Sequence, residues 1–494
     1  MTQPASKKIF LNAASAVLQV VTVGLMYFFL YKYLIKQIGV KQLGVWSLVV
    51  SSTSIANMAN FGITSGLVKF VAEFVAKEKV DELKKLIFTA LISILMFFSI
   101  FVSIAYLLLH FFIDKIIDKQ YINLAIAMLP YALFCLVINE VSGVFTSVLE
   151  GIQKNYIKNF IYINTSIIFL ISTFFFVPIY GLMGVVYAQL IQSLIILLAS
   201  FFISKKYIDG FSLFIWHWDK TIFKSLISYG SKFQLVSLLQ ILYEPTTKVL
   251  LSKFGGLQVV GFYEMASRFI SQIRAVINSA NQVMIPVVAQ AAQKSINDVM
   301  ALYKLAMSLT LLVAVPIISA VVVFSIYVCN FWIGHYEPNF ILPLTLLSIS
   351  TFFNVMCGPA YYSSLGEGKL SLLVFVHILM AVTNVLLGLI LGKLFGGTGV
   401  VWAWMLTLLF GSLILTIKYQ QKIKFRIKNV FLQNDYLLMS VGLFISVSLA
   451  IINNKLFNIN CTLNIYIVFL FFIVCFVPVL LMNNNVKTIF KRFK

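Results

Sequence analysis

The chain has 494 residues, of which 61% are hydrophobic and only 11% are charged, and its mean hydropathy is +0.98. Soluble domains carry roughly a quarter charged residues and less than about half apolar ones, so an ordinary globular protein and a disordered protein are excluded. The net charge of +21 does not indicate a nucleic-acid binder, because the basic residues lie in short clusters between apolar runs. We therefore predict an all-α polytopic membrane protein.

Fourteen apolar stretches are long enough to cross a bilayer, since a membrane-spanning helix needs about 20 apolar residues. The thirteenth is short, and twelve spans with two peripheral helices is the alternative. In chain order the predicted spans are 11–31, 43–66, 86–109, 122–149, 159–179, 182–203, 226–252, 257–290, 301–327, 341–365, 371–392, 397–417, 436–452 and 464–482.

The distribution of Lys and Arg predicts the orientation. If the N-terminus is inside, the inner segments and span ends carry 26 basic residues and the outer ones carry 9. Cytoplasmic segments are enriched in Lys and Arg, so we expect a multi-pass protein with both termini in the cytoplasm. We expect no signal peptide, because the apolar stretch after Lys7 and Lys8 lacks a small-residue cleavage site.

The sequence does not predict an enzyme. A membrane polymerase or glycosyltransferase needs a large outer loop or a soluble domain with paired acids, and the outer connections reach only about a dozen residues by the predicted spans. The five cysteines form no CxxC or His/Cys motif, so we expect no metal site.

An internal repeat relates the two halves of the chain. Segment 36–46 (KQIGVKQLGVW) resembles segment 253–263 (KFGGLQVVGFY) at an offset of 217 residues, and 181–188 (GLMGVVYA) resembles 396–403 (GGTGVVWA) at an offset of 215. Repeats with an even number of spans are parallel copies related by an axis along the membrane normal, with the substrate site between them. We predict an N-lobe (1–204), a cytoplasmic linker (205–225), a C-lobe (226–417) and a segment (418–494) with two extra helices and a basic tail.

Polar residues follow one face of the first, second, seventh and eighth spans at helical spacing. Lipid cannot solvate such groups, so these faces must meet protein or water. Interhelical hydrogen bonding is one explanation, and a wet central cavity is the other; the recurrence in equivalent spans favours the cavity. The stripe residues are Asn12, Ser15, Gln19, Thr22, Thr53, Asn57, Asn60, Thr64, Ser237, Gln240, Glu244, Thr247, Glu264, Arg268, Ser271, Asn278 and Gln282.

Charged residues of the seventh and eighth spans fall at matched distances from the turn at 255–256. At about 1.5 Å per helical residue, Glu244 lies level with Arg268 and Lys248 level with Glu264, so two cross-helix ion pairs are expected to offset the cost of burying charge. Lobe packing is one explanation of these pairs. In the other, Glu244 and Glu264 serve ion coupling or gating, and the cations face a substrate cavity for a diphosphate and sugar. The predicted cavity residues besides Arg274 are Arg268, Lys248, Asn57, Asn60, Asn278 and Gln282. Arg274 lies a turn and a half deeper, with no acid on its own helix within reach.

Arg274 is the strongest candidate for an anion contact, because a planar guanidinium donates two parallel hydrogen bonds to a phosphate. Glu140 in the fourth span is a candidate packing acid, ion or proton site, or partner of a cavity cation. Asn384, with His377 and Thr383, is a weaker candidate for an ion site with Glu244. The sequence requires no cofactor, and Na+ or H+ are the coupling ions considered.

Several segments, in this order, resemble polysaccharide-export flippases of the O-antigen type, in the multidrug/oligosaccharidyl-lipid/polysaccharide exporter superfamily. The resemblance covers nearly the whole chain and is carried by order and spacing. The segments are IGVKQLGVWSLV (38–49), FGITSGLVKFVAE (61–73), LEGIQKNYIKN (149–159), YGLMGVVYA (180–188) and GFYEMASRF (261–269).

The resemblance implies a protein of the bacterial inner membrane that flips a polyprenyl-diphosphate-linked oligosaccharide from the cytoplasmic to the outer leaflet by alternating access. It implies undecaprenyl-diphosphate glycans, membrane lipid and the polysaccharide polymerase machinery as partners, a monomer, and a groove for the lipid tail beside the last two helices. Related lipid II flippases use arginines in helices 1, 2 and 8, whereas here only the eighth span carries them. The alternative is a cation-coupled multidrug exporter of the same superfamily, whose cavity should favour acids and aromatic side chains for cationic drugs.

Overall fold

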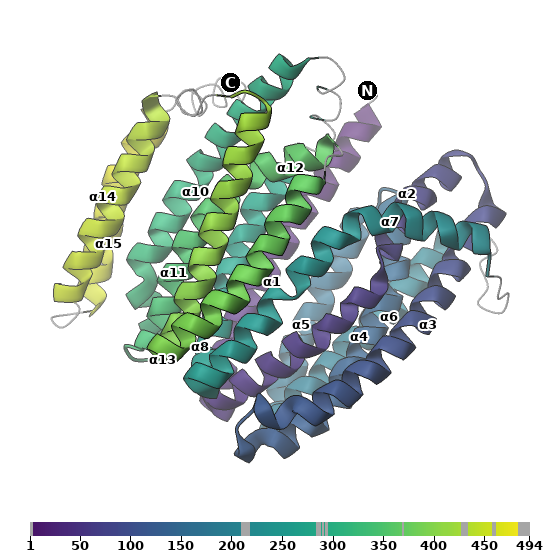
Figure 1. Ribbon diagram of the computed structural model, residues 1–494, viewed down its shortest axis with the longest axis horizontal. Helices are drawn as coiled ribbons and strands as arrows, with labels where there is room; N and C mark the ends of the chain where they lie inside the picture. Colours follow the sequence, from purple (N-terminus) through teal and green to yellow (C-terminus); the bar gives the residue numbers. More distant parts are fainter. Residues whose placement is uncertain are drawn as a thin grey trace. The chain divides into compact units, whose positions relative to one another are not determined.

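The computed structural model describes residues 3–208, 218–282, 288, 291, 295–367, 370–425, 433–456 and 461–482, and every regular element in them is helical (Figure 1). The middle of the predicted linker (209–217) and the basic tail (483–494) lie outside this part. The longer helices are α1 (Gln3–Thr53), α2 (Ile63–Ala76), α3 (Val80–Phe112), α4 (Ile122–Gly151), α5 (Asn155–Tyr180), α6 (Leu182–Lys206), α7 (Lys220–Ile241), α8 (Tyr243–Gln282), α10 (Ile296–Ile333), α11 (Pro338–Met356), α12 (Gly358–Gly366), α13 (Ser371–Lys422), α14 (Gln433–Leu456) and α15 (Cys461–Met482).

The prediction of an all-α multi-pass membrane protein is confirmed. Eight helical stretches of the described part are long and apolar enough to cross a membrane, and two of them, 14–60 and 371–422, each overlap two predicted spans. The predicted spans fall on helices throughout the described part. The count of fourteen crossings stays a prediction, because length and composition alone do not establish that the remaining helices cross.

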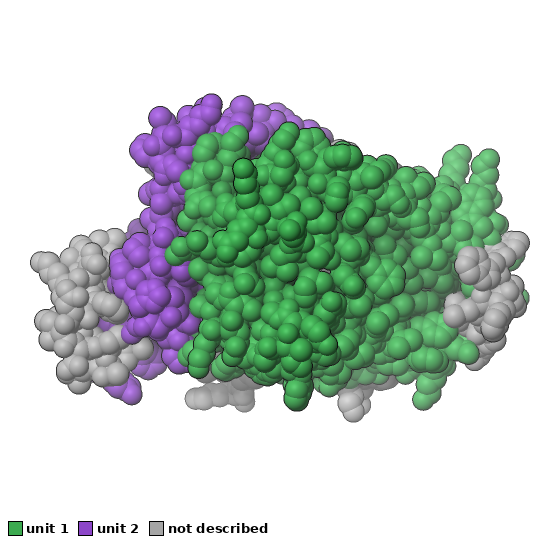
Figure 2. Space-filling view, turned by 90° about the horizontal axis from the view of Figure 1, so that it is seen from below, with its two compact units in different colours: residues 1–261 green, residues 262–494 purple. Residues whose placement is uncertain are grey.

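The chain divides into two compact units, residues 1–261 and 262–494 (Figure 2). In the first unit α4 packs on α3, α5 and α6, and α7 packs on α2 and α3. In the second unit α11 packs between α10 and α13, while α14 packs on α10 and α15. The predicted lobe boundaries at 204 and 226 stay predictions.

Four glycines mark the turns between consecutive spans, and they match in pairs as the repeat requires. Gly39 interrupts α1 at φ 78° and ψ 163°, and Gly256 interrupts α8 at φ 78° and ψ 171°. Gly181, between α5 and α6, has φ 56° and ψ −135°, and Gly396 within α13 has φ 64° and ψ −147°. The sequence repeat at offsets of 217 and 215 residues is therefore matched by a repeat in backbone conformation.

We expect Gly256→Ala to lower the free energy of unfolding by about 1–3 kcal/mol, because a side chain in this region of φ and ψ strains the backbone. An added Cβ at Gly256 or Gly39 would meet no atom within 4 Å, so the effect comes from the backbone alone. Thermal unfolding in detergent should show similar losses of stability for Gly256→Ala and Gly39→Ala. Gly143→Ala should lose little stability, because Gly143 has an ordinary φ. Equal melting temperatures for all three variants would contradict the prediction that a side chain at Gly256 or Gly39 strains the backbone.

The predicted second, seventh and tenth spans are not continuous α-helices. The second passes through a 3-10 helix, η1 (Ser54–Asn60), and a left-handed turn at Phe61 and Gly62 before α2 begins. The seventh breaks between α7 and α8, because Pro245 has no N–H and its ring clashes with the carbonyl of Ile241. The tenth breaks between α11 and α12, where Pro359 follows Gly358. The single-face stripe predicted for the second span was therefore wrong in detail, because Asn57 and Asn60 lie on the 3-10 segment. The stripe of the seventh span stays a prediction, since Leu242 between α7 and α8 has helical φ and ψ.

A close helix crossing joins α1 to the stretch of α8 just after the Gly256 kink. A Cβ added to Gly44 would overlap the Leu257 carbonyl oxygen and lie 3.3 Å from the Gly261 nitrogen, and a Cβ on Gly261 would overlap the Val40 carbonyl oxygen. At the repeat offset of 217 residues, Gly44 corresponds to Gly261 and Val40 to Leu257. The contact is thus reciprocal, and glycine is needed on both helices for their backbones to touch.

Candidate functional site

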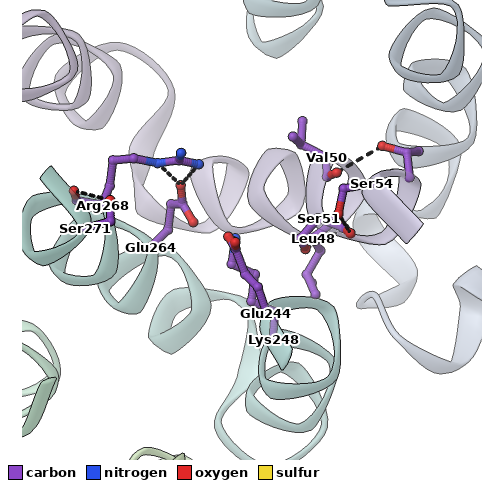
Figure 3. Close-up of polar contacts among 10 residues, drawn as sticks. Leu48, Val50, Ser51, Ser54, Glu244, Lys248, Glu264, Arg268 and Ser271 are labelled. Atoms are coloured by element: carbon purple, nitrogen blue, oxygen red, sulfur yellow. Dashed lines mark hydrogen bonds and ion pairs between the residues drawn. The ribbon is translucent and has the colours of Figure 1, made fainter. Parts of the chain in front are cut away.

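The candidate site is built on α8, whose two halves meet at the Gly256 kink and each carry a pair of opposite charges one turn apart. Lys248 Nζ lies 2.5 Å from Glu244 Oε1 in the first half. In the second half Arg268 donates to Glu264 Oε1 from Nε (3.2 Å) and Nη2 (3.0 Å) (Figure 3). The i,i+4 spacing places both members of each pair on one face of the helix.

The two ion pairs differ in which member is buried, the base in the first and the acid in the second. The Lys248 side chain is 2% exposed and its partner Glu244 is 52% exposed, whereas Glu264 is 2% exposed and Arg268 is 33% exposed. Buried charge is tolerated when it is paired and hydrogen-bonded. The second half of α8 consequently presents the cationic member of its pair and buries the acid.

The predicted cross-helix pairs, Glu244 with Arg268 and Lys248 with Glu264, join residues of the two separately described units. They stay a prediction. The ion pairs within each half of α8 were not anticipated, although the spacing of four residues in both was a sufficient signal.

The first repeat carries aromatic side chains where the second carries the first ion pair. Tyr27 and Tyr31 are the counterparts of Glu244 and Lys248, and their rings stack with centroids 5.8 Å apart. Tyr31 also contacts the Trp46 ring at 6.2 Å. The same i,i+4 geometry therefore holds an aromatic pair in one repeat and an ion pair in the other, so strong charge is concentrated on α8.

Arg274 and Asn278 continue along α8 beyond Arg268, and both are half-buried. Ser271, between them and the ion pair, donates to the Arg268 carbonyl oxygen at 2.8 Å. The positions 264, 268, 271, 274 and 278 follow one another at three or four residues, so they share a face of this continuous helix. Gln282 is the last residue of α8, and its side chain lies outside the described residues.

A second polar cluster lies in the first unit, at the break in the predicted second span. Asn60, the last residue of η1, donates from Nδ2 to Glu140 Oε2 on α4. Its Oδ1 accepts from the Thr64 hydroxyl at 3.2 Å and from the Thr64 N–H at 3.4 Å. Asn57 is half-buried on the same 3-10 segment. The structure therefore brings together Glu140 and Asn60, two residues that the sequence singled out separately.

The break holds this cluster against α7. A Cβ on Gly62 would lie 2.5 Å from the Gly230 carbonyl oxygen of α7. The backbones of the broken second span and α7 are therefore in direct contact. Discontinuous helices are the places where transporters expose backbone and polar groups at membrane depth.

Asn384 is 1% exposed on α13, and the neighbouring Thr383 donates to the Leu379 carbonyl oxygen at 2.8 Å. His377 on the same helix is buried, with its ring 6.2 Å from that of Tyr361. The suggested ion site with Glu244 would join the two units and stays a prediction.

Sequence reasoning missed Asn281, which lies one turn beyond Asn278 on α8. Its Oδ1 accepts from Thr310 Oγ1 at 3.0 Å, while its buried Nδ2 has no hydrogen-bond partner within the described part of the chain. A Cβ on Gly358, at the α11–α12 break, would lie 2.8 Å from that Nδ2. The three-residue spacing from Asn278 and the Gly-Pro pair at 358–359 were the signals that could have identified this position.

Comparisons with known proteins agree with this architecture. Among solved structures, an inward-facing multidrug resistance MATE family transporter of the MOP superfamily has a TM-score of 0.71 at 15% identity, covering 83% of this chain and 98% of that one. The lipid II flippase MurJ, in an inward closed conformation, has a TM-score of 0.69 at 16% identity and covers 99% of both chains. A MOP superfamily transporter from Pyrococcus furiosus has a TM-score of 0.62 at 14% identity, covering 85% and 96%.

The comparison with curated proteins returns no match. The family model described as polysaccharide biosynthesis protein matches residues 9–292, which is more than half of the chain and includes both charge pairs and the Asn60–Glu140 cluster. The solved transporters share their fold with this chain, and their sequence identities of 15% and 16% establish a common fold only. This chain therefore belongs to the polysaccharide biosynthesis protein family and shares the fold of these solved transporters.

Proposed function

We propose that this protein is a flippase that moves a polyprenyl-diphosphate-linked oligosaccharide, an O-antigen or similar surface-polysaccharide repeat unit, from the cytoplasmic to the periplasmic leaflet. The observation that carries the proposal is the polar face of α8 beyond Gly256. There Glu264 is buried while Arg268 is one-third exposed, and Arg274 and Asn278 follow on the same face. A cationic face with amide groups suits a diphosphate joined to a sugar.

Family and fold support this proposal at a coarser level. The family is one of polysaccharide biosynthesis, and a lipid II flippase shares the fold over nearly its whole length. A bacterial inner-membrane location is part of this proposal, and the bias of Lys and Arg supports an orientation with both termini in the cytoplasm. The substrate would reach the site by alternating access of the two repeats.

Glu140 is our candidate for coupling the cycle to H+ or Na+. It is half-buried, it is hydrogen-bonded to Asn60 at a helix break, and intramembrane acids commonly mark ion or proton pathways. Asn60 donates a hydrogen bond to the Glu140 carboxylate from Nδ2, while the Asn60 Oδ1 accepts a hydrogen bond from the Thr64 hydroxyl. The Asn60 amide is therefore held in the orientation that fixes one side of the carboxylate.

Substitution of Arg274 tests the proposed diphosphate contact. We expect Arg274→Ala to abolish flipping while the protein still inserts, and Arg274→Lys to keep part of the activity, because Lys retains the charge but loses the planar fork. The assay follows the lipid-linked glycan in cells that lack the native gene and express each variant. A complete repeat unit should accumulate on the cytoplasmic leaflet with Arg274→Ala. Normal surface polysaccharide in that variant would show that Arg274 is not part of the substrate site.

A cation-coupled multidrug exporter is the second candidate, because MATE transporters share the fold. Deletion of the gene separates the two functions. Loss of surface polysaccharide with trapped lipid-linked glycan supports the flippase. Intact polysaccharide with reduced efflux of cationic dyes supports the exporter.

A further inference from the structure

An apolar pocket of about 360 Å³ lies in the first unit, among α3, α4 and α6. This volume is near the lower end of the roughly 300–1,000 Å³ range of small-molecule pockets. Every lining residue is apolar. The lining residues are Phe88, Leu91, Ile92, Leu95, Val141, Phe145, Leu197, Leu198, Phe201 and Phe202.

The walls of the pocket are held in place by specific contacts. The rings of Phe145 (α4) and Phe201 (α6) meet edge to face with centroids 5.3 Å apart. Ser204 donates to the Phe145 carbonyl oxygen at 3.0 Å, which ties the end of α6 to α4. The pocket is therefore formed by packed helices and does not depend on a loop.

The mouth of the pocket opens away from the protein core. Leu95, Leu198 and Phe202 line it and are 37%, 53% and 61% exposed. In a membrane protein, apolar side chains with such exposure on the outer face of a helix meet lipid hydrocarbon. A hydrocarbon chain of the surrounding bilayer is thus the molecule with direct access.

Lysines cap one end of this pocket. On α3, Lys84 precedes Phe88, Leu91 and Leu95 at spacings of four, three and four residues, so it lies on the same helical row. On α6, Lys205 follows Phe201 by four residues and Leu198 by seven. Because α3 begins and α6 ends close to these lining residues, their spacing places the lysines of both helices toward the same end of the pocket.

Lys85 and Lys206 adjoin these two lysines, so four cations lie within about one turn of the lining residues. Asp81 pairs with Lys84 at 3.4 Å but is 89% exposed, and therefore lies on the aqueous side. The charge bias predicts that this end is cytoplasmic, where basic pockets between membrane helices bind anionic headgroups.

We propose that this pocket binds one acyl chain of an anionic glycerophospholipid, whose phosphate is held by Lys84, Lys85, Lys205 and Lys206. The apolar pocket begins about one helical turn from the lysines, which matches a lipid whose chains start a few bonds from its phosphate. The site is built from different helices than the proposed substrate face, so it stands whether or not the protein is a flippase.

The test uses full-length protein in nanodiscs of phosphatidylcholine that contain phosphatidylglycerol with a photoreactive diazirine in one acyl chain. After illumination, labelled peptides are mapped by mass spectrometry. We expect labelling of residues 88–95 and 197–202, at least fivefold above that from diazirine-labelled phosphatidylcholine at the same mole fraction. Replacement of the four lysines by Gln should reduce labelling to the phosphatidylcholine level, while Lys304→Gln with Lys418→Gln in the second unit should not.

Adjacent residues of α3 supply matched controls for the pocket itself. Leu95→Trp should fill the mouth and lower labelling at least fivefold, whereas Met96→Trp, at a 49% exposed position that does not line the pocket, should leave it unchanged. Equal labelling by both lipids, or no effect of Leu95→Trp, would overturn the proposal. So would displacement by polyprenyl phosphate, or crosslinking of benzoylphenylalanine at position 95 to residues 209–217.

Discussion

Gly44→Val is expected to reduce transport at least tenfold while the protein still inserts and folds. A Cβ at this position overlaps the Leu257 carbonyl oxygen, so the new side chain must push α1 away from the stretch of α8 just after Gly256. Overpacking of this kind typically costs about 1–3 kcal/mol, which is enough to change the populations of two transport states by one to two orders of magnitude. The variant should therefore favour the state in which this crossing is open.

The direction of that shift can be measured with a cysteine at Ser51. The Ser51 side chain is buried, and its hydroxyl donates to the Leu48 carbonyl oxygen of its own helix, so a thiol there is a conservative probe. We expect Gly44→Val to increase labelling of Ser51→Cys by a membrane-impermeant maleimide added from outside.

The repeat supplies a second variant, and another glycine supplies the control. Gly261→Val should act like Gly44→Val, since a Cβ there overlaps the Val40 carbonyl oxygen in the reciprocal contact. Gly143→Ala should keep normal transport and labelling, because its added Cβ makes only an ordinary 3.4 Å contact with a Thr64 methyl group. Normal transport and unchanged labelling with Gly44→Val would show that the crossing does not move during the cycle.

Exchanging the two residues of the Glu264–Arg268 pair should distinguish their contribution to stability from their contribution to substrate selection. The single change Glu264→Gln is expected to lower the free energy of unfolding by about 1–3 kcal/mol, because a buried acceptor of two charged hydrogen bonds is weakened. The double variant Glu264→Arg with Arg268→Glu retains an i,i+4 pair and should recover part of that loss. Thermal unfolding in detergent measures both effects.

Transport by the exchanged pair distinguishes the two candidate functions. The exchange places an acid at the one-third exposed position 268, where it would repel a diphosphate and attract a cation. For a flippase, we expect at least a hundredfold loss of lipid-linked glycan transport despite recovered stability. Retained or increased efflux of a cationic dye, with glycan transport unaffected, would instead favour the multidrug exporter.

Several features could be predicted from the sequence because each depends on residues close together in the chain. Apolar runs of about 20 residues can satisfy their backbone hydrogen bonds only as helices in a membrane, and the helices appear where the runs are. The repeat identified Gly39 and Gly256 as equivalent, since a backbone conformation that favours glycine requires glycine at the same position of both repeats. The charged face of α8 followed from its spacing.

The partners of the polar residues were decided by tertiary structure. Asn60 reaches Glu140 only because the second span unwinds into a 3-10 helix and α4 packs beside it, and a stripe read at a constant helical period cannot anticipate that break. The reciprocal contact of Gly44 and Gly261, and the pocket among α3, α4 and α6, likewise depend on how closely separate helices approach. Helix formation is governed by local hydrogen bonding, whereas helix approach is governed by side-chain shape at contacts between residues that are far apart in the chain.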